Sequence, residues 1–420
     1  MHSQNSLVAR VWAAARQDWR QVFNSGIWKS QPTIWMLDGA NARGLRNLDA
    51  VAPALRRVNP PHLYISNCIA LENLDGLNRL TGLQLLDLNG WAALQNVDGL
   101  KGLTGLRWLD LSRCATLRNV DGLKGLTGLQ SLYLHGCTAL QNVEALKGLT
   151  GLQWLYFSNC AALQNVDGLK GLIGLQTLDL RGCVALQNVD GLRGLTSLRT
   201  LDLNYCDTLQ NVDGLKGLSG LERLNFDRCA ALQNVDGLKG LAALQRLNLR
   251  ECTALQNVDG LQGLARLEWL DLAVCTALQN VDGLQGLTGL ETLELGYCAA
   301  LQNVDGLKGL TRLRWLNLSD CTALQNVDGL KGLTRLRTLV LTDCGALQNV
   351  DGLKGITGLQ DLYLGGRSKI SDSALQELRA ALPKTQVILP DFWKSPRIFG
   401  PERVHSQPSA PSPKALFPPP

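Results

Sequence analysis

One block of 23 residues is repeated with small changes along most of the chain, and this repetition constrains the fold more than any other feature. The block reads LQSLYLHGCTALQNVEALKGLTG over residues 129–151. A period between 20 and 50 residues is typical of a solenoid, in which each repeat buries its apolar face by stacking on its neighbours. Trp91 and Arg367 stand at two positions where the spacing predicts a cysteine. The other repeats align on Cys68, Cys114, Cys137, Cys160, Cys183, Cys206, Cys229, Cys252, Cys275, Cys298, Cys321 and Cys344.

Two spacings of apolar residues divide each repeat. Leu129, Leu132 and Leu134 form LxxLxL, the spacing of a short strand whose alternate side chains point inward. After them every third residue is apolar, and this set is Cys137, Leu140, Val143, Leu146 and Leu149. That spacing favours an extended or 3₁₀ path over a full α-helix. The sequence therefore predicts a β-rich α/β solenoid.

The pattern LxxLxLxxCxxL, followed by VxxLxxL, resembles the leucine-rich repeat family in its cysteine-containing form. The resemblance covers roughly residues 63–364. It implies a right-handed coil with a parallel β-sheet on its concave side and short 3₁₀ or extended segments on its convex side. It also implies that the concave sheet binds another macromolecule, although a fold by itself does not establish a function.

A repeat array escapes the usual division of a long chain into several domains, because its core grows in one dimension. Residues 32–59 read as a degenerate first repeat, since terminal repeats are commonly irregular. We expect five segments, which are an amphipathic capping helix region at 1–31, the degenerate repeat at 32–59, the repeat array at 60–370, a helix–strand cap at 371–390 and a Pro-rich disordered tail at 391–420.

Apolar residues recur at helical spacing near the N-terminus, and Arg10, Asp18 and Arg20 interrupt any long apolar run. We therefore predict neither a signal peptide nor a transmembrane span there. A helix that shields the first repeat is the simplest interpretation. Two alternatives remain: an amphipathic helix on an anionic membrane, which we do not favour, and an adaptor-docking helix, because VWAAARQDWRQVFNSGIW weakly resembles the second half of an F-box.

The residues after the array predict a short cap. Ser371 or Asp372 can serve as the N-cap of a helix that Pro383 stops, and residues 387–389 can pair with the last strand of the sheet. The segment beyond Pro390 is rich in Pro and Ser, so we expect a mobile tail. A Pro-rich ligand for a partner domain is the alternative interpretation of that tail.

Twelve cysteines at equivalent positions are expected to project inward as a row of reduced, buried thiols. A row of equivalents offers no preferred disulfide pair, and so many free thiols indicate the cytoplasm or another reducing compartment, which is a host cytosol if the protein is a secreted effector. There is no CxxC motif, and the histidines are few and scattered. We predict no metal and no other cofactor.

A repeated Asn-Val-Asp-Gly motif, as at Asn96–Gly99, predicts a tight turn in each repeat. The Asp is expected to cap the amides of the convex turn, and the Asn to bond the backbone of the next repeat. A column of carboxylates could instead bind calcium. However, a lysine such as Lys101 follows three residues after most of these Asp residues and supplies a countercharge.

The outward-facing strand positions vary from repeat to repeat, whereas the turn motif hardly changes. Large aromatic and arginine side chains dominate binding hot spots, and exposed aromatic rings at these positions do not serve the core. The predicted partner-binding residues are Tyr64, Trp108, Tyr133, His135, Trp154, Tyr156, Arg181, Arg223, Arg246, Arg250, Trp269 and Trp315. The alternative is that the arginines pair with neighbouring acids and that the aromatics are incidental strand formers.

Charge and chemistry narrow the function further. The net charge of +5 arises in the flanks, because residues 1–59 hold 8 basic and 3 acidic residues and residues 367–420 hold 8 and 4, against 25 and 29 in the array. This distribution does not suit nucleic acid. His135 is the only histidine placed for chemistry, so no catalytic site is predicted. We expect a monomeric, non-enzymatic scaffold that binds a protein on its concave face, or alternatively a substrate receptor or effector that docks an adaptor or a membrane through its N-terminal helix.

Overall fold

The computed structural model describes residues 28–31, 34–37, 48, 52–65, 68 and 70–389. The expected capping helix of residues 1–31 and the Pro-rich tail lie outside these residues, apart from a first strand at Trp28–Gln31. The chain divides into two compact units between Leu186 and Gln187. Below, unit 1 denotes the described residues up to Leu186, and unit 2 those from Gln187 onward.

Every repeat contributes one short strand. In unit 1 the strands are β1 (Trp28–Gln31), β2 (Ile34–Leu37), β3 (His62–Tyr64), β4 (Leu85–Asp87), β5 (Trp108–Asp110), β6 (Ser131–Tyr133), β7 (Trp154–Tyr156) and β8 (Thr177–Asp179). In unit 2 they are β9 (Thr200–Asp202), β10 (Arg223–Asn225), β11 (Arg246–Asn248), β12 (Trp269–Asp271), β13 (Thr292–Glu294), β14 (Trp315–Asn317), β15 (Thr338–Thr342), β16 (Asp361–Gly365) and β17 (Gln386–Ile388).

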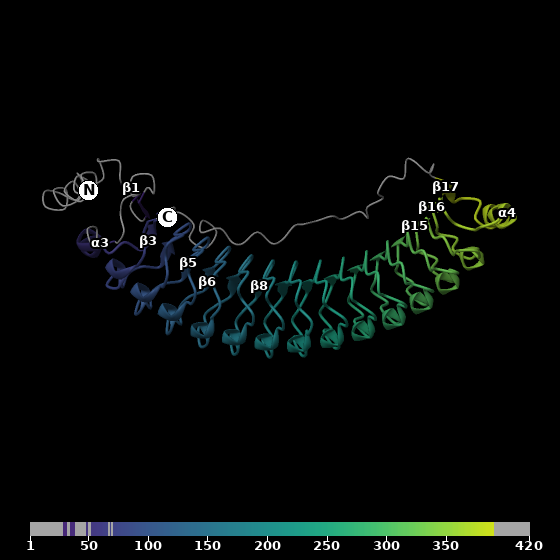
Figure 1. Cartoon of the computed structure of the whole chain (residues 1–420). Coiled ribbons are helices and arrows are strands. Elements are labelled where there is room, and N and C mark those ends of the chain that lie inside the picture. The colour runs from purple at the N-terminus through teal and green to yellow at the C-terminus, as the bar shows by residue number, and fades with distance from the viewer. Residues whose placement is uncertain are drawn as a thin grey trace. The chain divides into compact units, whose positions relative to one another are not determined.

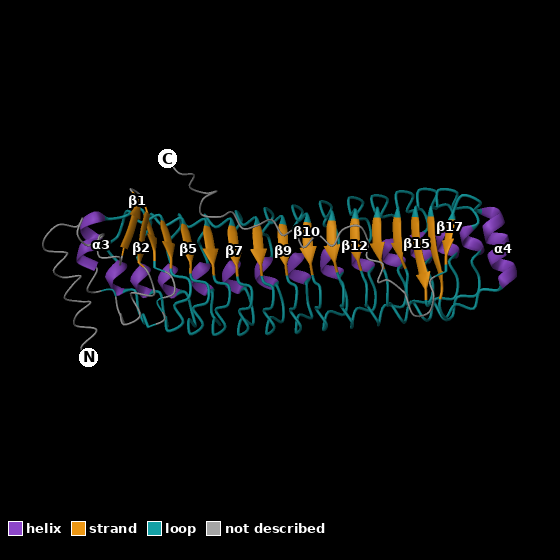
Figure 2. Cartoon of the chain, turned by 90° about the horizontal axis from the view of Figure 1, so that it is seen from above, coloured by secondary structure: helices purple, strands orange, loops and turns teal. Residues whose placement is uncertain are grey.

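A 3₁₀ turn follows nearly every strand, on the opposite side of the coil. In unit 1 these turns are Asp75–Leu77, Asp98–Leu100, Asp121–Leu123, Glu144–Leu146 and Asp167–Leu169. In unit 2 they are Asp190–Leu192, Asp213–Leu215, Asp236–Leu238, Asp259–Leu261, Asp282–Leu284, Asp305–Leu307, Asp328–Leu330 and Asp351–Leu353. Within each unit the strands and the turns form two separate layers (Figures 1 and 2). The predicted leucine-rich repeat coil is confirmed.

The strands pair in parallel with an offset of one repeat, so that equivalent residues lie side by side. Leu109 of β5 pairs with Leu132 of β6, and Leu270 of β12 pairs with Leu293 of β13. These leucines are fully buried. The β1–β2 pair is an antiparallel exception at the N-terminal end. Because each repeat places its leucines against those of its neighbours, burial is continuous along each unit.

The cysteine row lies inside the coil, and all twelve thiols are buried. The Cys137 Sγ donates to the Leu111 carbonyl oxygen at 3.1 Å, and the Cys275 Sγ donates to the Leu249 oxygen at 3.1 Å. These thiols thus satisfy a carbonyl that directly follows a strand of the preceding repeat; Cys183 and Cys252 make the same bond to Phe157 and Phe226. Trp91 takes the same role, because its Nε1 donates to the backbone carbonyl of Ile65. Burial raises the pKa of Cys137 to about 12.

The Asn and Asp side chains of the Asn-Val-Asp-Gly turn make other contacts than we expected. The Asn96 Oδ1 accepts the amide of Asp98 at 3.1 Å, within its own repeat rather than in the next one. Asp98 does not cap the turn, because the N-cap position belongs to Val97, which makes no side-chain cap bond. Its carboxylate instead meets Lys101 Nζ at 2.8 Å. The same lysine pairing recurs at Lys170, Lys216, Lys308, Lys331 and Lys354.

Helices close the described ends of the coil. Helix α3 (Ala52–Val58) stands where the first repeat would carry its 3₁₀ turn, and a Cβ built on Gly76 would lie 3.0 Å from the Cβ of Ala52. Helix α4 (Asp372–Ala381) begins after Ser371, whose side chain accepts the amide of Ala374. After it, β17 pairs in parallel with β16.

Candidate binding surface

The outward side of the strands, here called the strand face, is the surface expected to be concave. In each strand from β3 to β16 the second residue is a leucine that points into the core, and the side chains before and after it point outward. These outward positions form a first and a third column along each unit. His135, Arg181 and Arg250 lie two residues after the end of a strand, and the other predicted binding residues belong to these columns.

The side chains of the third column help to end the strands, a structural role that the sequence did not reveal. Where it holds Asp or Asn, the side-chain oxygen accepts the backbone amide two residues later. The distances are 2.7 Å for Asp110 to Ser112, 3.0 Å for Asn225 to Asp227 and 2.8 Å for Asp271 to Ala273. This bond forms a turn that ends the strand. The repeats that lack Asp or Asn here carry Tyr64, Tyr133, Tyr156, Glu294, Val340 and Tyr363.

In unit 1 three of the predicted rings pack into one cluster. The rings of Tyr133 and Tyr156 are stacked, with centroids 4.8 Å apart and planes 7° apart. Trp108 lies 5.1 Å from Tyr133 at an angle of 45°. Because adjacent strands bring the rings into contact, they cover one another. Trp108 is only 4% exposed and Tyr156 9%, so the expectation that these rings are exposed is wrong.

The other predicted residues of unit 1 surround this cluster with polar contacts. Tyr64, Trp154 and His135 are partly buried. The His135 Nδ1 lies 3.1 Å from the Ser158 Oγ, which donates to the Asp179 Oδ2 at 3.2 Å. Ser158 thus links the His135 ring to the Asp179 carboxylate. Arg181 forms an ion pair with the same Asp179, with its Nη2 2.8 Å from the Oδ2.

In unit 2 the predicted arginines differ in their surroundings. Arg223 is exposed and lies beside Arg246 in the register of β10 and β11. The Arg250 Nε is 3.3 Å from Glu251 Oε1, and the Arg228 Nε is 2.9 Å from Glu251 Oε2. The pairing of arginines with nearby acids, which was the alternative interpretation, therefore holds for Arg250, as it does for Arg181 in unit 1.

Trp269 and Trp315, the predicted aromatic residues of unit 2, lie on either side of β13. Trp315 Nε1 donates to Glu294 Oε1 at 2.7 Å, and the Asn317 amide donates to Glu294 Oε2 at 2.9 Å. Burial is the main cause that raises the pKa of Glu294 to about 7, and the nearby Asp271 charge adds to it. Trp315 therefore holds a buried carboxyl group that titrates near neutral pH.

A further column escaped the sequence analysis. The residue before each cysteine from Cys114 to Cys344, and before Trp91, has a left-handed backbone, because its amide must reach the carbonyl of the next repeat, as Val274 N does to Gly296 O at 2.8 Å. Glycine fits this conformation best, and in unit 1 the position holds Gly90, Arg113, Gly136, Asn159 and Gly182. In unit 2 the same position holds Tyr205, Arg228, Glu251, Val274, Tyr297, Asp320 and Asp343. The recurrence of glycine before cysteine was the available signal.

Val274→Gly is expected to stabilise the protein by about 1 kcal/mol, because a β-branched residue with φ of +64° is strained where glycine is not. The measurement is the midpoint of thermal unfolding by calorimetry. Gly136→Val at the equivalent position of unit 1 (φ +71°) is the reverse change and should lower the midpoint. A Val274→Gly protein that melts at or below the temperature of the original would contradict the strain.

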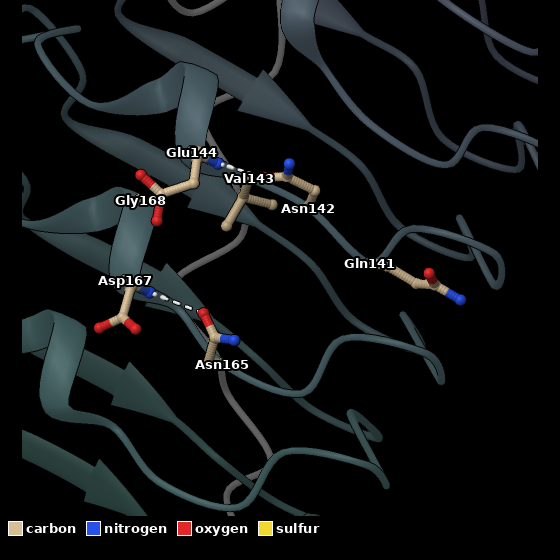
Figure 3. Close-up of a pocket in the computed structure, with 7 residues that line it drawn as sticks. All are labelled: Gln141, Asn142, Val143, Glu144, Asn165, Asp167 and Gly168. Atoms are coloured by element: carbon tan, nitrogen blue, oxygen red, sulfur yellow. Dashed lines mark hydrogen bonds between the residues drawn. The ribbon is translucent and has the colours of Figure 1, made fainter.

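On the turn face, which is the side of the coil that carries the 3₁₀ turns, an open hollow of about 220 Å³ lies between two successive turns of unit 1. Here Glu144 and Ala145 replace the usual Asp-Gly pair. Figure 3 shows the acidic side chains of Glu144 and Asp167 pointing to the same side of these turns. The Asn142 and Asn165 oxygens are already taken by the amides of Glu144 and Asp167, at 2.8 and 3.2 Å. The polar groups that remain in the hollow include the Glu144 carboxylate, the Gln141 side chain and the Asp167 carboxylate, which pairs with Lys170.

The described residues lack both a membrane-spanning helix and a group of side chains that could bind a metal ion. No helix among them is long and apolar enough to cross a membrane. Within the same residues, no group of three or more His, Cys, Asp or Glu side chains is placed to hold a metal ion.

Comparisons with known proteins agree with this geometry. A model of the BspA-type leucine-rich repeat region matches in six copies, over residues 66–187, 110–233 and 250–371. An internalin (inlF) from Listeria monocytogenes is similar in structure, with 16% identity, a TM-score of 0.50, and 92% of this chain and 90% of the internalin covered. The TLR13–ssRNA13 complex gives 18% identity and a TM-score of 0.58, and covers 84% of this chain but 56% of the receptor. No curated protein matches the sequence.

Proposed function

The chain belongs to the leucine-rich repeat proteins of the BspA type, and we propose that it is a non-enzymatic scaffold that binds a protein partner on its strand face. Proteins with this repeat generally bind proteins or other ligands. One observation carries the proposal. The turn motif is copied almost unchanged, whereas the outward strand positions differ from repeat to repeat. Packing alone does not require this variety, because the core needs only the inward leucines.

The aromatic cluster of unit 1 is the proposed centre of the contact. Trp154 lies next to Ser131 in register and is partly exposed, beside the stacked Tyr133 and Tyr156. Tryptophan and tyrosine supply most of the energy in many protein interfaces, since they bury a large area at a small cost in side-chain entropy. The exposed Tyr205 and Tyr297 of the left-handed column are further candidates in unit 2.

A photocrosslinking amino acid at position 154 tests this proposal directly. It should capture a partner that is then identified by mass spectrometry, whereas the same group at Lys124, on the turn face, should not. Trp154→Ala should then weaken binding of the identified protein by about 2 kcal/mol, measured by calorimetry. Equal capture at both positions, or an unchanged affinity, would remove the strand face of unit 1 from the proposal.

Nucleic acid is the second candidate, because the Toll-like receptor of similar fold was solved in complex with RNA. In unit 1, however, the strand face carries Asp87 and Asp110, which repel phosphate. We therefore favour a protein partner and a monomeric scaffold. The location in a reducing compartment is also a proposal, which the row of buried thiols supports.

An adaptor-docking or membrane-bound N-terminal helix remains the alternative proposal for residues 1–30. A pull-down that compares the full chain with one lacking these residues distinguishes this alternative from a scaffold that binds through its strand face alone. Loss of one component with retention of the strand-face partner would favour the alternative.

A further inference from the structure

Two neighbouring carboxylates on the strand face of unit 1 form no ion pair with a lysine or arginine in the part of the chain that the structure describes. Asp87 and Asp110 pair in the register of β4 and β5. Each accepts a backbone amide, from Asn89 at 2.9 Å and from Ser112 at 2.7 Å. Among the described residues neither carboxylate takes part in an ion pair, whereas Asp179 of the same column is gripped by Arg181. This pair therefore presents negative charge that its own unit does not neutralise.

The pKa values of both carboxyl groups are raised, so their charged forms are disfavoured in the folded protein. Burial raises the pKa of Asp87 to about 6, and the charge of Asp110 contributes to the rise. Burial also raises the pKa of Asp110, against the opposing effects of hydrogen bonds from Ser112 and Asn89 and of the His135 charge. Asn occupies the equivalent position at Asn225 and Asn248 and makes the same amide bond. The fold therefore does not need a charge at this position.

Aromatic rings flank the carboxylates on both sides. Tyr64 is the register neighbour of Asp87, and Tyr133 is the neighbour of Asp110. The third column thus reads Tyr64, Asp87, Asp110, Tyr133 at a spacing of roughly 4.8 Å between strands. A planar guanidinium can donate hydrogen bonds to both carboxylates and stack on the ring of Tyr64, which an ammonium does less well.

Beside this column, two buried polar atoms of unit 1 have no hydrogen-bond partner. Trp108 precedes Asp110 on the same strand, and its Nε1 is buried without a hydrogen-bond partner, as is the Oγ of the adjacent Ser131. Buried polar groups in proteins are nearly always paired, because an unpaired one loses its bond to water without replacement. Because the Tyr133 ring packs 5.1 Å from Trp108 and the donor has almost no exposed surface, a carbonyl group of a partner reaches it only when a ring of the cluster moves aside.

We propose that Tyr64, Asp87, Asp110 and Tyr133 form a recognition site for an arginine side chain within an extended basic segment of the protein partner. This inference rests on the proposed function of the strand face and specifies its partner. Two carboxylates fall short of the six to eight oxygen ligands that calcium takes. They also repel the phosphates of RNA, so a cationic polypeptide fits this site better than either.

The test uses the full chain and three fluorescein-labelled peptides of equal length, with alternating Arg-Ser, Lys-Ser or Glu-Ser sequences. Fluorescence anisotropy should show the Arg-Ser peptide binding most tightly and the Glu-Ser peptide not binding. The double variant Asp87→Asn with Asp110→Asn keeps both amide acceptors and removes only the charge. It should weaken binding of the Arg-Ser peptide about tenfold or more.

The matched control removes the same charge from the turn face of unit 1, through Asp98→Asn with Asp121→Asn. It should change the affinity less than about twofold. A nonspecific attraction depends only on total charge, so it would weaken equally in the two double variants. Equal losses in the two double variants would overturn the site, as would tighter binding of the Lys-Ser peptide or of a single-stranded RNA oligonucleotide.

The partner captured through position 154 separates this inference from the proposed function. If Trp154→Ala weakens that partner and the Asp87→Asn, Asp110→Asn variant does not, the strand face is the interface and the arginine site is wrong. If neither variant changes the affinity, both proposals fail. Loss in both variants supports both.

Discussion

Gly260→Ala should destabilise the protein by about 3 kcal/mol or more, because the turns of successive repeats touch through their backbones. A Cβ added at Gly260 would lie 1.9 Å from the carbonyl oxygen of Val235 and 2.8 Å from the amide nitrogen of Asp236. Neither backbone atom can rotate away, so the stack must open at this point. Chemical unfolding followed by circular dichroism measures the loss.

Gly263→Ala, three residues later, is the matched control. This glycine has φ of +84° and nothing within 4 Å of an added Cβ, so only conformational strain of about 1 kcal/mol is expected. The two variants make the same chemical change in the same repeat. A similar loss in both would show that glycine is needed here for its backbone freedom and not for close stacking.

Ala145 shows that the array accommodates a side chain at this position once. It stands where other repeats have the turn glycine, and it is 8% exposed. Its turn borders the hollow of Figure 3, which lies between it and the next turn. At the other turn glycines an added Cβ meets the preceding turn, as Gly168 meets Val143, so the Ala145 methyl group faces the turn before it and not the hollow. Unit 2 has glycine in all of its turns, so the full penalty is expected at Gly260.

Stability should fall as pH rises from about 4.5 to above 7, and Glu294 is one cause. Its pKa is near 7 in the folded protein, against an ordinary value of 4.5, because burial disfavours the charged form and Asp271 repels it, although Arg250 partly offsets this. A raised folded pKa means that the protonated carboxyl contributes stability at low pH, which is lost as pH rises through 7. A shift of this size corresponds to about 3 kcal/mol.

Glu294→Gln tests this account, because the amide keeps the shape of the side chain and cannot ionise. The variant should be more stable than the original at pH 8 and similar to it at pH 5, in urea unfolding at both values. Asp282→Asn, on the turn face of the same unit, is the control and should not reduce the pH dependence. An unchanged pH profile in the Glu294 variant would assign the titration to other groups.

Much of the fold could be predicted because its determinants repeat. The spacing of Leu132, Leu134 and Cys137 in one repeat carries little weight alone, but each further copy makes an accidental pattern less plausible. Even the exceptions were informative. Trp91 fills a cysteine position and still donates a hydrogen bond to the preceding repeat.

The candidate surface was only partly predictable. The alternation of strand side chains places Trp108, Tyr133 and Tyr156 on the outer face, and the structure agrees. Alternation does not determine exposure, however, because the rings lie on adjacent strands and cover one another. The acids of the third column were likewise recognised as outward, but their bonds to backbone amides depend on how each strand ends.

By itself, the sequence determined the period, the leucine core, the inward cysteines and the order of strand and turn, since these depend on the spacing of residues along one chain. The tertiary structure alone decided which turn glycines meet a neighbouring backbone, which rings are hidden, and which carboxylates lack a cation. Each of these depends on contacts between successive repeats. Those contacts are set by how closely the repeats stack, a distance that no single repeat encodes.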